Sequence, residues 1–151
     1  MTKAGEFTKI AVLFLMGGFI YAAIEIAYKG DTHFSMFIVG GLCFILIGGI
    51  NNYFRYDMPL INQMMISSVI ITVLEFICGC IVNLWLDLSV WDYSALPLNL
   101  LGQVCLLFMV IWFFLSLPAI LIDDFVRWKM FEEEKPRYYL FRTPVPPAKQ
   151  I

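Results

Sequence analysis

Two carboxylates stand inside long apolar stretches of this chain. Glu25 lies in "IYAAIEIAYKG" and Glu75 lies in "ITVLEFICG", each among isoleucine and other apolar side chains. An ionised carboxylate in the middle of a bilayer costs roughly 2.5–3.5 kcal/mol on insertion scales, so each of the two needs a partner or a function. The chemistry open to such groups is the transfer of a proton, the binding of a cation, or a hydrogen bond to a neighbouring helix.

Glu25 has a cation close by in the sequence. Lys29 stands one helical turn further on, at the favourable i,i+4 spacing, and the carboxylate is about one turn from the predicted membrane boundary. A local ion pair that reaches toward the headgroups explains Glu25 without any further role. A place on a substrate path is the alternative.

Glu75 has no cation on its own helix. Ser68, Thr72 and Gly79 share its helical face, and small or polar side chains of this kind are typical of contacts between membrane helices. Either the carboxyl group keeps its proton and hydrogen-bonds to a neighbour, or it lines a water-filled cavity. Both interpretations place it at a helix interface. The neighbours expected for it are Asn99, Gly102 or Gln103.

No other group of residues indicates an active centre. The four cysteines (Cys43, Cys78, Cys80 and Cys105) lie inside apolar runs without metal-ligand spacing, and His33 is the only histidine. The sequence has no nucleophile triad, phosphate loop or Walker motif. We therefore expect no enzyme, no metal and no cofactor, and any ATP hydrolysis would belong to a separate chain.

The elements that carry these residues are membrane spans. The chain has 151 residues and is 61% hydrophobic, which is too apolar for a soluble domain of this size. A net charge of −2 and the lack of a basic, aromatic-rich patch exclude a nucleic-acid partner. Residue alternation typical of strands is absent, so an all-α membrane fold is predicted. Its four transmembrane helices are expected at 10–28, 34–50, 60–86 and 98–122.

The distribution of Lys and Arg predicts the orientation. Nine of these residues fall on the termini and the middle loop, whereas Lys29 is alone on the opposite side, so both termini should be cytoplasmic. We expect a transmembrane domain over 1–134 and a proline-broken cytoplasmic tail over 135–151, which either docks a partner or is disordered. A cleaved signal peptide is the alternative for the first span.

The two halves of the chain share a plan that argues against the signal peptide. Glu25 and Glu75 lie late in the first helix of each half, and a Gly-x-x-Cys motif follows in each. These motifs are Gly40 to Cys43 and Gly102 to Cys105. The pattern predicts a duplicated two-helix hairpin, in parallel orientation. The paired glycines at 17–18, 40–41 and 48–49 indicate close helix packing, with an unwound binding helix as the alternative.

The second half resembles a known family. Its segments "LEFICGCIVN" and "WDYSALPLNLLGQVCL" are similar to the small bacterial membrane proteins described as type IV ABC transporters. The matching residues are Glu75, Gly79, Trp91, Asp92, Tyr93, Ser94, Asn99, Leu100, Gly102, Cys105 and Trp112. The first half departs from the pattern, with "KGDTHF" in its loop and no proline before Cys43. The resemblance implies a transport component in the bacterial inner membrane.

The Trp-Asp-Tyr-Ser loop has two interpretations. It is a rigid re-entry turn, with its aromatic rings at headgroup depth, or it is a site at the outer mouth formed by Asp92, Asn99 and Glu75.

The prediction for function is a small membrane subunit of a transport system. Its polar line would comprise Glu75, Thr72, Asn99 and Gln103, with Glu25 from the first half. Four helices enclose too little for a broad pathway, so we expect a homo-oligomer or a partnership with a separate ATPase or membrane subunit. The rival is a non-transporting oligomer: an assembly, sensor or pore-forming effector subunit. A membrane enzyme ranks third.

Overall fold

The computed structural model describes residues 3–54 and 58–141, and within these ranges the chain is a bundle of four long helices. All four are long and apolar enough to cross a membrane, which confirms the predicted all-α membrane fold. The helices are α1 (Lys3–Lys29), α2 (Phe34–Phe54), α3 (Leu60–Gly79), which the π-helix η1 (Cys80–Trp85) continues, and α4 (Leu106–Phe131).

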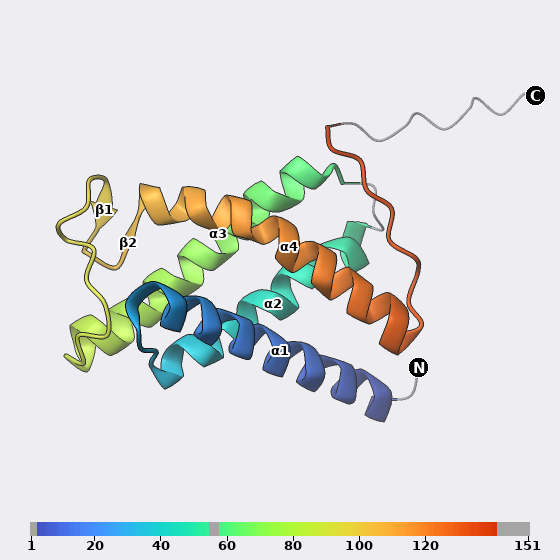
Figure 1. The fold of residues 1–151 in the computed structure, drawn as a ribbon, viewed down its shortest axis with the longest axis horizontal. Coiled ribbons are helices and arrows are strands. Elements are labelled where there is room, and N and C mark those ends of the chain that lie inside the picture. Colours follow the sequence, from blue (N-terminus) through green and yellow to red (C-terminus); the bar gives the residue numbers. More distant parts are fainter. Residues whose placement is uncertain (1–2, 55–57, 142–151) are drawn as a thin grey trace, which may run out of the picture.

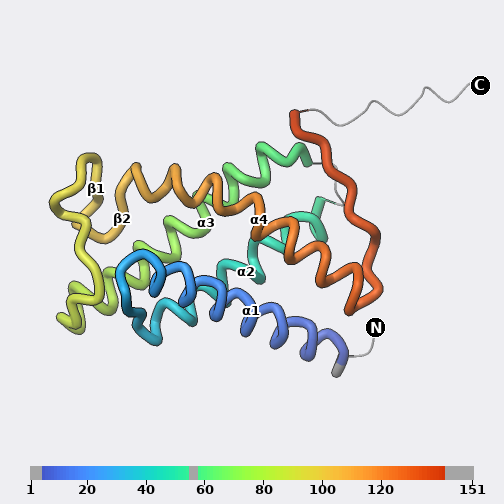
Figure 2. The backbone as a smooth tube through the Cα atoms, viewed as in Figure 1, coloured from blue at the N-terminus to red at the C-terminus, as the bar shows by residue number. Residues whose placement is uncertain are grey.

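The bundle has two distinct ends (Figure 1). The start of α1, the end of α2, the start of α3 and the end of α4 gather at one end, called here the tail end. The turn between α1 and α2 and the segment from η1 to α4 gather at the other, called the hairpin end. Figure 2 shows the same arrangement as a tube. The cytoplasmic location of the tail end stays a prediction.

Glycines let α1 and α2 approach closely along an antiparallel hairpin. A Cβ placed on Gly40 would lie 2.8 Å from the carbonyl oxygen of Gly17 and would collide with the side chain of Tyr21. Both helices continue without a break through their glycine pairs. Gly17 and Gly40 therefore serve packing, and the alternative of an unwound binding helix is wrong for these two elements.

The fourth helix begins at Leu106, whereas the apolar run predicted a start at Leu98. Asn99–Leu100 (β1) instead pairs in antiparallel register with Val104–Cys105 (β2). Leu98 and Leu101 have positive φ angles of 53° and 52°, which a helix does not allow, and Gly102 turns the chain at φ 70°. The turn escaped prediction because leucines surround Asn99 and Gly102, so that the segment reads as part of the apolar run.

The far end of α4 lies beyond the predicted span. The helix continues past Ile122 to Phe131 and stops at Glu132, which has a left-handed φ of 55°. Residues 132–141 then cross the tail end, where the Leu60 amide donates to the carbonyl of Tyr139 (2.7 Å). This part of the predicted tail packs on the bundle itself, and residues 142–151 lie outside the described ranges.

The duplicated hairpin stays a prediction. Gly40 and Cys43 lie well inside α2, whereas Gly102 and Cys105 lie in the β1–β2 turn and the strand that precedes α4. The two Gly-x-x-Cys motifs thus have different local structures.

Candidate functional site

Glu75 lies where α1, α3 and α4 meet. Its side chain is buried, at 3% exposure. The Tyr21 hydroxyl of α1 donates to Oε1, and the Trp112 indole Nε1–H of α4 donates to Oε2 (2.9 Å). The two rings also stack, with centroids 5.3 Å apart. One carboxyl group thereby connects three helices, and we call these residues the Glu75 network.

The environment of Glu75 agrees with the sequence prediction in one respect and not in another. The residue faces other helices, as expected, because lipid would leave its oxygens without donors. Its hydrogen-bond partners are Tyr21 and Trp112, so the expected neighbours Asn99, Gly102 and Gln103 are wrong. The turn that moves the start of α4 to Leu106 also moves these three residues toward the hairpin end.

Sequence reasoning missed Tyr21. The signal was a hydroxyl-bearing ring inside an apolar run, since a buried tyrosine needs a partner for its O–H. Nothing in the sequence pairs that hydroxyl with a carboxylate 54 positions away.

Gln103 belongs to a second network at the hairpin end. Its Oε1 accepts from Asn83 Nδ2 (2.8 Å), and its backbone carbonyl accepts from Trp91 Nε1 (2.9 Å). Gly79 makes room for this contact, because a Cβ there would lie 2.6 Å from Gln103 Oε1. The network holds η1 against the segment that leads into α4.

The Trp-Asp-Tyr-Ser segment forms a tight turn. Asp92 Oδ1 accepts from the Ser94 hydroxyl and from the Ser94 backbone N–H (2.8 Å), and these bonds hold the pKa of Asp92 below its usual value. Asn99 bridges the Leu96 carbonyl (2.8 Å) and the Gly102 N–H (3.0 Å). These contacts support the interpretation of a rigid re-entry.

Tyr93 turns inward from the same loop. Its ring stacks on Phe108 of α4 with centroids 4.5 Å apart, and burial raises the pKa of its phenol well above the ordinary value. The phenol therefore stays protonated, and the Tyr93 side chain is neutral.

The predicted polar line does not assemble into one site. Thr72 donates to the Ser68 carbonyl one turn back (2.8 Å), as membrane-helix threonines commonly do. Glu25 pairs with Lys29 (2.9 Å) and accepts from the Thr32 hydroxyl. Asn99 is exposed in the loop. The local ion pair expected for Glu25 is present.

A cavity of about 500 Å³ opens between α1, α4 and the loop over residues 90–96. The buried Tyr21 and Trp112 line it, and so do the less buried Glu25, Lys29 and Asp92, which we call its rim. We call it the outer compartment. Of the predicted candidates, it brings together Glu25, Asp92, Trp91, Tyr93 and Trp112.

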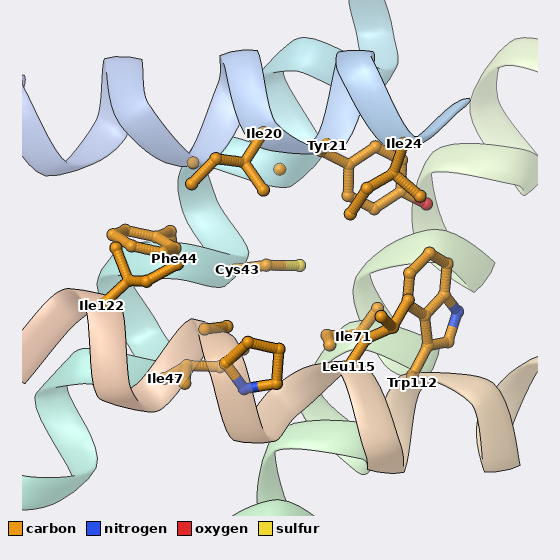
Figure 3. Close-up of a pocket in the computed structure, with 14 residues that line it drawn as sticks. Ile20, Tyr21, Ile24, Cys43, Phe44, Ile47, Ile71, Trp112, Leu115 and Ile122 are labelled. Carbon is orange, nitrogen blue, oxygen red and sulfur yellow. The ribbon is translucent and has the colours of Figure 1, made fainter. Parts of the chain in front are cut away.

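A smaller cavity of about 100 Å³ adjoins the first. Figure 3 shows its apolar lining, with Ile20 of α1, Phe44 of α2 and Ile122 of α4 around it. We call it the inner compartment. Both cavities are lined by Tyr21, Ile24, Trp112 and Leu115, so two members of the Glu75 network belong to their shared wall.

A separate polar cluster lies at the tail end. Asp123 pairs with Arg127 (Nε to Oδ2, 2.5 Å), and Asp124 Oδ2 accepts from Asn51 Nδ2 (2.7 Å) and Tyr138 O–H (2.8 Å). Within the described residues, Oδ1 of each aspartate has no hydrogen-bond partner. The cluster connects α2, α4 and the tail. Both aspartates lie inside α4.

The described part of the chain contains no group of three or more His, Cys, Asp or Glu that could hold a metal ion. All four cysteines are unpaired thiols, and Cys43 and Cys105 are buried.

One comparison with known proteins gives a match. The family model described as "Putative ABC-transporter type IV" matches residues 12–140, and so includes the first half, where the resemblance in sequence is loose. No curated protein and no solved structure matches the chain.

Proposed function

The chain belongs to the family described as "Putative ABC-transporter type IV", and on that premise we propose that it is a small subunit of a transport system in the bacterial inner membrane. The observation that carries the proposal is the cavity between α1 and α4, whose wall includes Tyr21 and Trp112 of the Glu75 network. Ligand sites between helices of a bundle have this form: a mostly apolar lining with a few polar groups.

The Glu75 network links the helices on the two sides of the cavity. Tyr21 belongs to α1, whereas Glu75 and Trp112 belong to α3 and α4, so any movement of α1 away from α4 must break the Tyr21–Glu75 bond or move Glu75 with it. In the closed arrangement both oxygens of the buried Glu75 carboxyl group accept a hydrogen bond from a neutral donor, so this arrangement is favourable. We propose that α1 separates from α4 when substrate enters and that the network restores the closed arrangement.

The source of energy lies outside this chain in our proposal. The sequence carries no nucleotide-binding motif, so the subunit is not an enzyme and depends on a separate ATPase or a further membrane subunit. The cavity between α1, α4 and the loop has a volume of only about 500 Å³, and a second copy of the chain would complete a wider pathway. We therefore propose a homo-oligomer or a mixed complex, with both termini in the cytoplasm.

A matched pair of substitutions on α4 tests the proposal. Leu115 lines both compartments, whereas Leu107 is 52% exposed and lies outside both linings. Cells with the wild-type chain, no chain, Leu115→Trp or Leu107→Trp are compared for the accumulation of a panel of solutes, measured by mass spectrometry of cell extracts. We expect removal of the chain to change at least one solute, Leu115→Trp to reproduce that change, and Leu107→Trp to match the wild type.

Two results would overturn the proposal. In one, removal of the chain changes no solute. In the other, Leu115→Trp reaches the membrane in normal amount and behaves as wild type. The second candidate function, a non-transporting oligomer, would then stand, because the satisfied oxygens of Glu75 also suit a group that only holds helices together.

A further inference from the structure

We propose that the two compartments bind an amphiphilic organic cation, with its ammonium group in the outer compartment and its hydrocarbon chain in the inner one. The inference rests on the proposed function and names the substrate class of the same cavity. It is argued from the aromatic lining, the charge at the rim and the change in polarity between the two compartments.

The outer compartment is rich in ring surfaces. Tyr93 stacks on Phe108, and Tyr28 meets the same ring edge-on with centroids 5.7 Å apart. Trp91 and Trp112 also line the space. An ammonium group is attracted to the faces of such rings, and aromatic enclosures are the usual way in which proteins bind quaternary ammonium ligands.

The charges of the outer compartment favour a cation. Its lining contains two carboxylates, Glu25 and Asp92, against one ammonium group, Lys29. Lys29 is already paired with Glu25 (2.9 Å) and lies 3.5 Å from a carboxylate oxygen of Asp31. An anionic headgroup would therefore meet carboxylates and find no uncommitted basic side chain in this lining. A cationic headgroup would meet net negative charge, and the attraction between the two is stronger in a partly buried site than in water.

The inner compartment suits hydrocarbon. Ile20, Phe44, Ile47 and Ile122 surround it, and its lining contains no charged side chain. Burial of an alkyl chain there is favourable by the hydrophobic effect when the chain leaves water, and each added methylene should tighten binding. The space between α1 and α4 is thus charged in the outer compartment and apolar in the inner one. This matches a ligand with one charged end and one hydrocarbon end.

The experiment measures binding to the full-length chain in nanodiscs of zwitterionic lipid by isothermal titration calorimetry, with protein-free nanodiscs as the blank. The probes are hexyltrimethylammonium, hexyl phosphate with the same chain and opposite charge, and tetramethylammonium without the chain. We expect saturable binding of hexyltrimethylammonium, at least tenfold tighter than either of the other two probes.

Variants assign the effect to the two compartments. Glu25→Gln and Asp92→Asn together should weaken hexyltrimethylammonium binding by about threefold to tenfold, since they remove the negative charge of the rim. Leu115→Trp should abolish the advantage of the hexyl chain, and Leu107→Trp should bind as the wild type does. Should Leu115→Trp fail to fold, the dependence of affinity on alkyl length in the wild-type chain gives the same test.

Equal or tighter binding of hexyl phosphate would overturn the substrate class, and so would the absence of saturable binding above the blank. These failures are distinct from failure of the proposed function. If Leu115→Trp changes solute accumulation in cells while hexyl phosphate is the preferred probe, transport stands and the cationic substrate does not.

Discussion

Glu25 and Glu75 hold corresponding places in the two halves of the sequence and have opposite environments in the structure. Glu25 is partly buried near the hairpin end, and its main partner is a cation on the same helix, Lys29. Glu75 is buried and has neutral donors from two other helices, Tyr21 and Trp112. A glutamate thus makes an ion pair within its own helix in the first half, whereas in the second half it connects three helices.

The difference lies in what each carboxylate leaves behind when it is removed. Loss of Glu25 leaves Lys29, which is partly exposed and also contacts the Val90 carbonyl (3.2 Å). Loss of Glu75 leaves a tyrosine O–H and an indole N–H in an apolar interior, and an orphaned buried donor costs about 1–3 kcal/mol. Predicted effects should therefore be large at Glu75 and small at Glu25.

Glu75→Leu should have the largest effect. It leaves the Tyr21 hydroxyl and the Trp112 indole N–H without an acceptor. We expect it to destabilise the bundle by about 2–4 kcal/mol, seen as a clear fall in the thermal unfolding midpoint in detergent. Val73→Leu, on the exposed side of the same helix at 50% exposure, is the matched control and should change little. Glu75→Gln should recover most of the loss, because its amide oxygen can accept from Trp112 Nε1 and its amide nitrogen can donate to the Tyr21 hydroxyl oxygen. A Glu75→Leu protein as stable as the wild type would contradict the role of Glu75 in connecting helices.

Gly40→Ala tests whether this connection depends on the position of α1. A Cβ at Gly40 would collide with Tyr21 and push α1 from α2, and overpacking of this kind costs about 1–3 kcal/mol. Gly49→Ala is the control, since beyond its own stretch of helix backbone no atom lies within 4 Å of a Cβ there. It should be neutral or stabilising by about 0.5–1 kcal/mol through its helix propensity. Both are measured by thermal unfolding, and equal effects of the two would contradict the packing argument.

Double-mutant cycles sharpen the comparison directly. Tyr21→Phe combined with Glu75→Leu should show a coupling of about 1 kcal/mol, because each change alone removes the Tyr21–Glu75 hydrogen bond, which crosses between helices in a dry interior. Lys29→Met combined with Glu25→Gln should give no more than about 0.5 kcal/mol, the usual value for an i,i+4 pair. Unfolding midpoints in denaturant supply the four free energies for each cycle. A larger coupling at Glu25 would reverse our ranking.

These two carboxylates also show how far sequence reasoning reaches. The span count, the burial of Glu75 and the Glu25–Lys29 pair follow from apolar run length, the cost of charge in lipid and helical spacing. The partners of Glu75 do not follow, because Tyr21 and Trp112 come from other helices whose rotation depends on the packing of the whole bundle. The turn at Leu98–Gly102 was hidden by its apolar composition, and the cavity arises from how α1 and α4 diverge.

Glu25→Gln should have a small effect on the fold. We expect less than about 0.5 kcal/mol of destabilisation and an unchanged oligomeric state, because the amide still accepts from Thr32 and Lys29 keeps its contact with Val90. Size-exclusion chromatography with multi-angle scattering checks assembly. Loss of assembled protein from membranes would show that Glu25 has a structural role as large as that of Glu75.

Asp92→Asn should have the smallest effect, confined to the loop. The donors from Ser94 lower the pKa of Asp92, so the ionised carboxylate stabilises the turn above the unfolded pKa, and this contribution is lost as pH falls through the folded pKa. Hydrogen exchange of residues 90–96 should therefore be faster in Asp92→Asn than in wild type at neutral pH, and the difference should shrink under acidic conditions. Exchange within α3 around Glu75 should not change, since the turn contacts the bundle through Trp91 and Tyr93 rather than through Asp92. Faster exchange in α3 would mean that the rim and the Glu75 network are coupled. Asp92 would then resemble Glu75, whose contacts reach other helices, rather than Glu25, whose contacts are local.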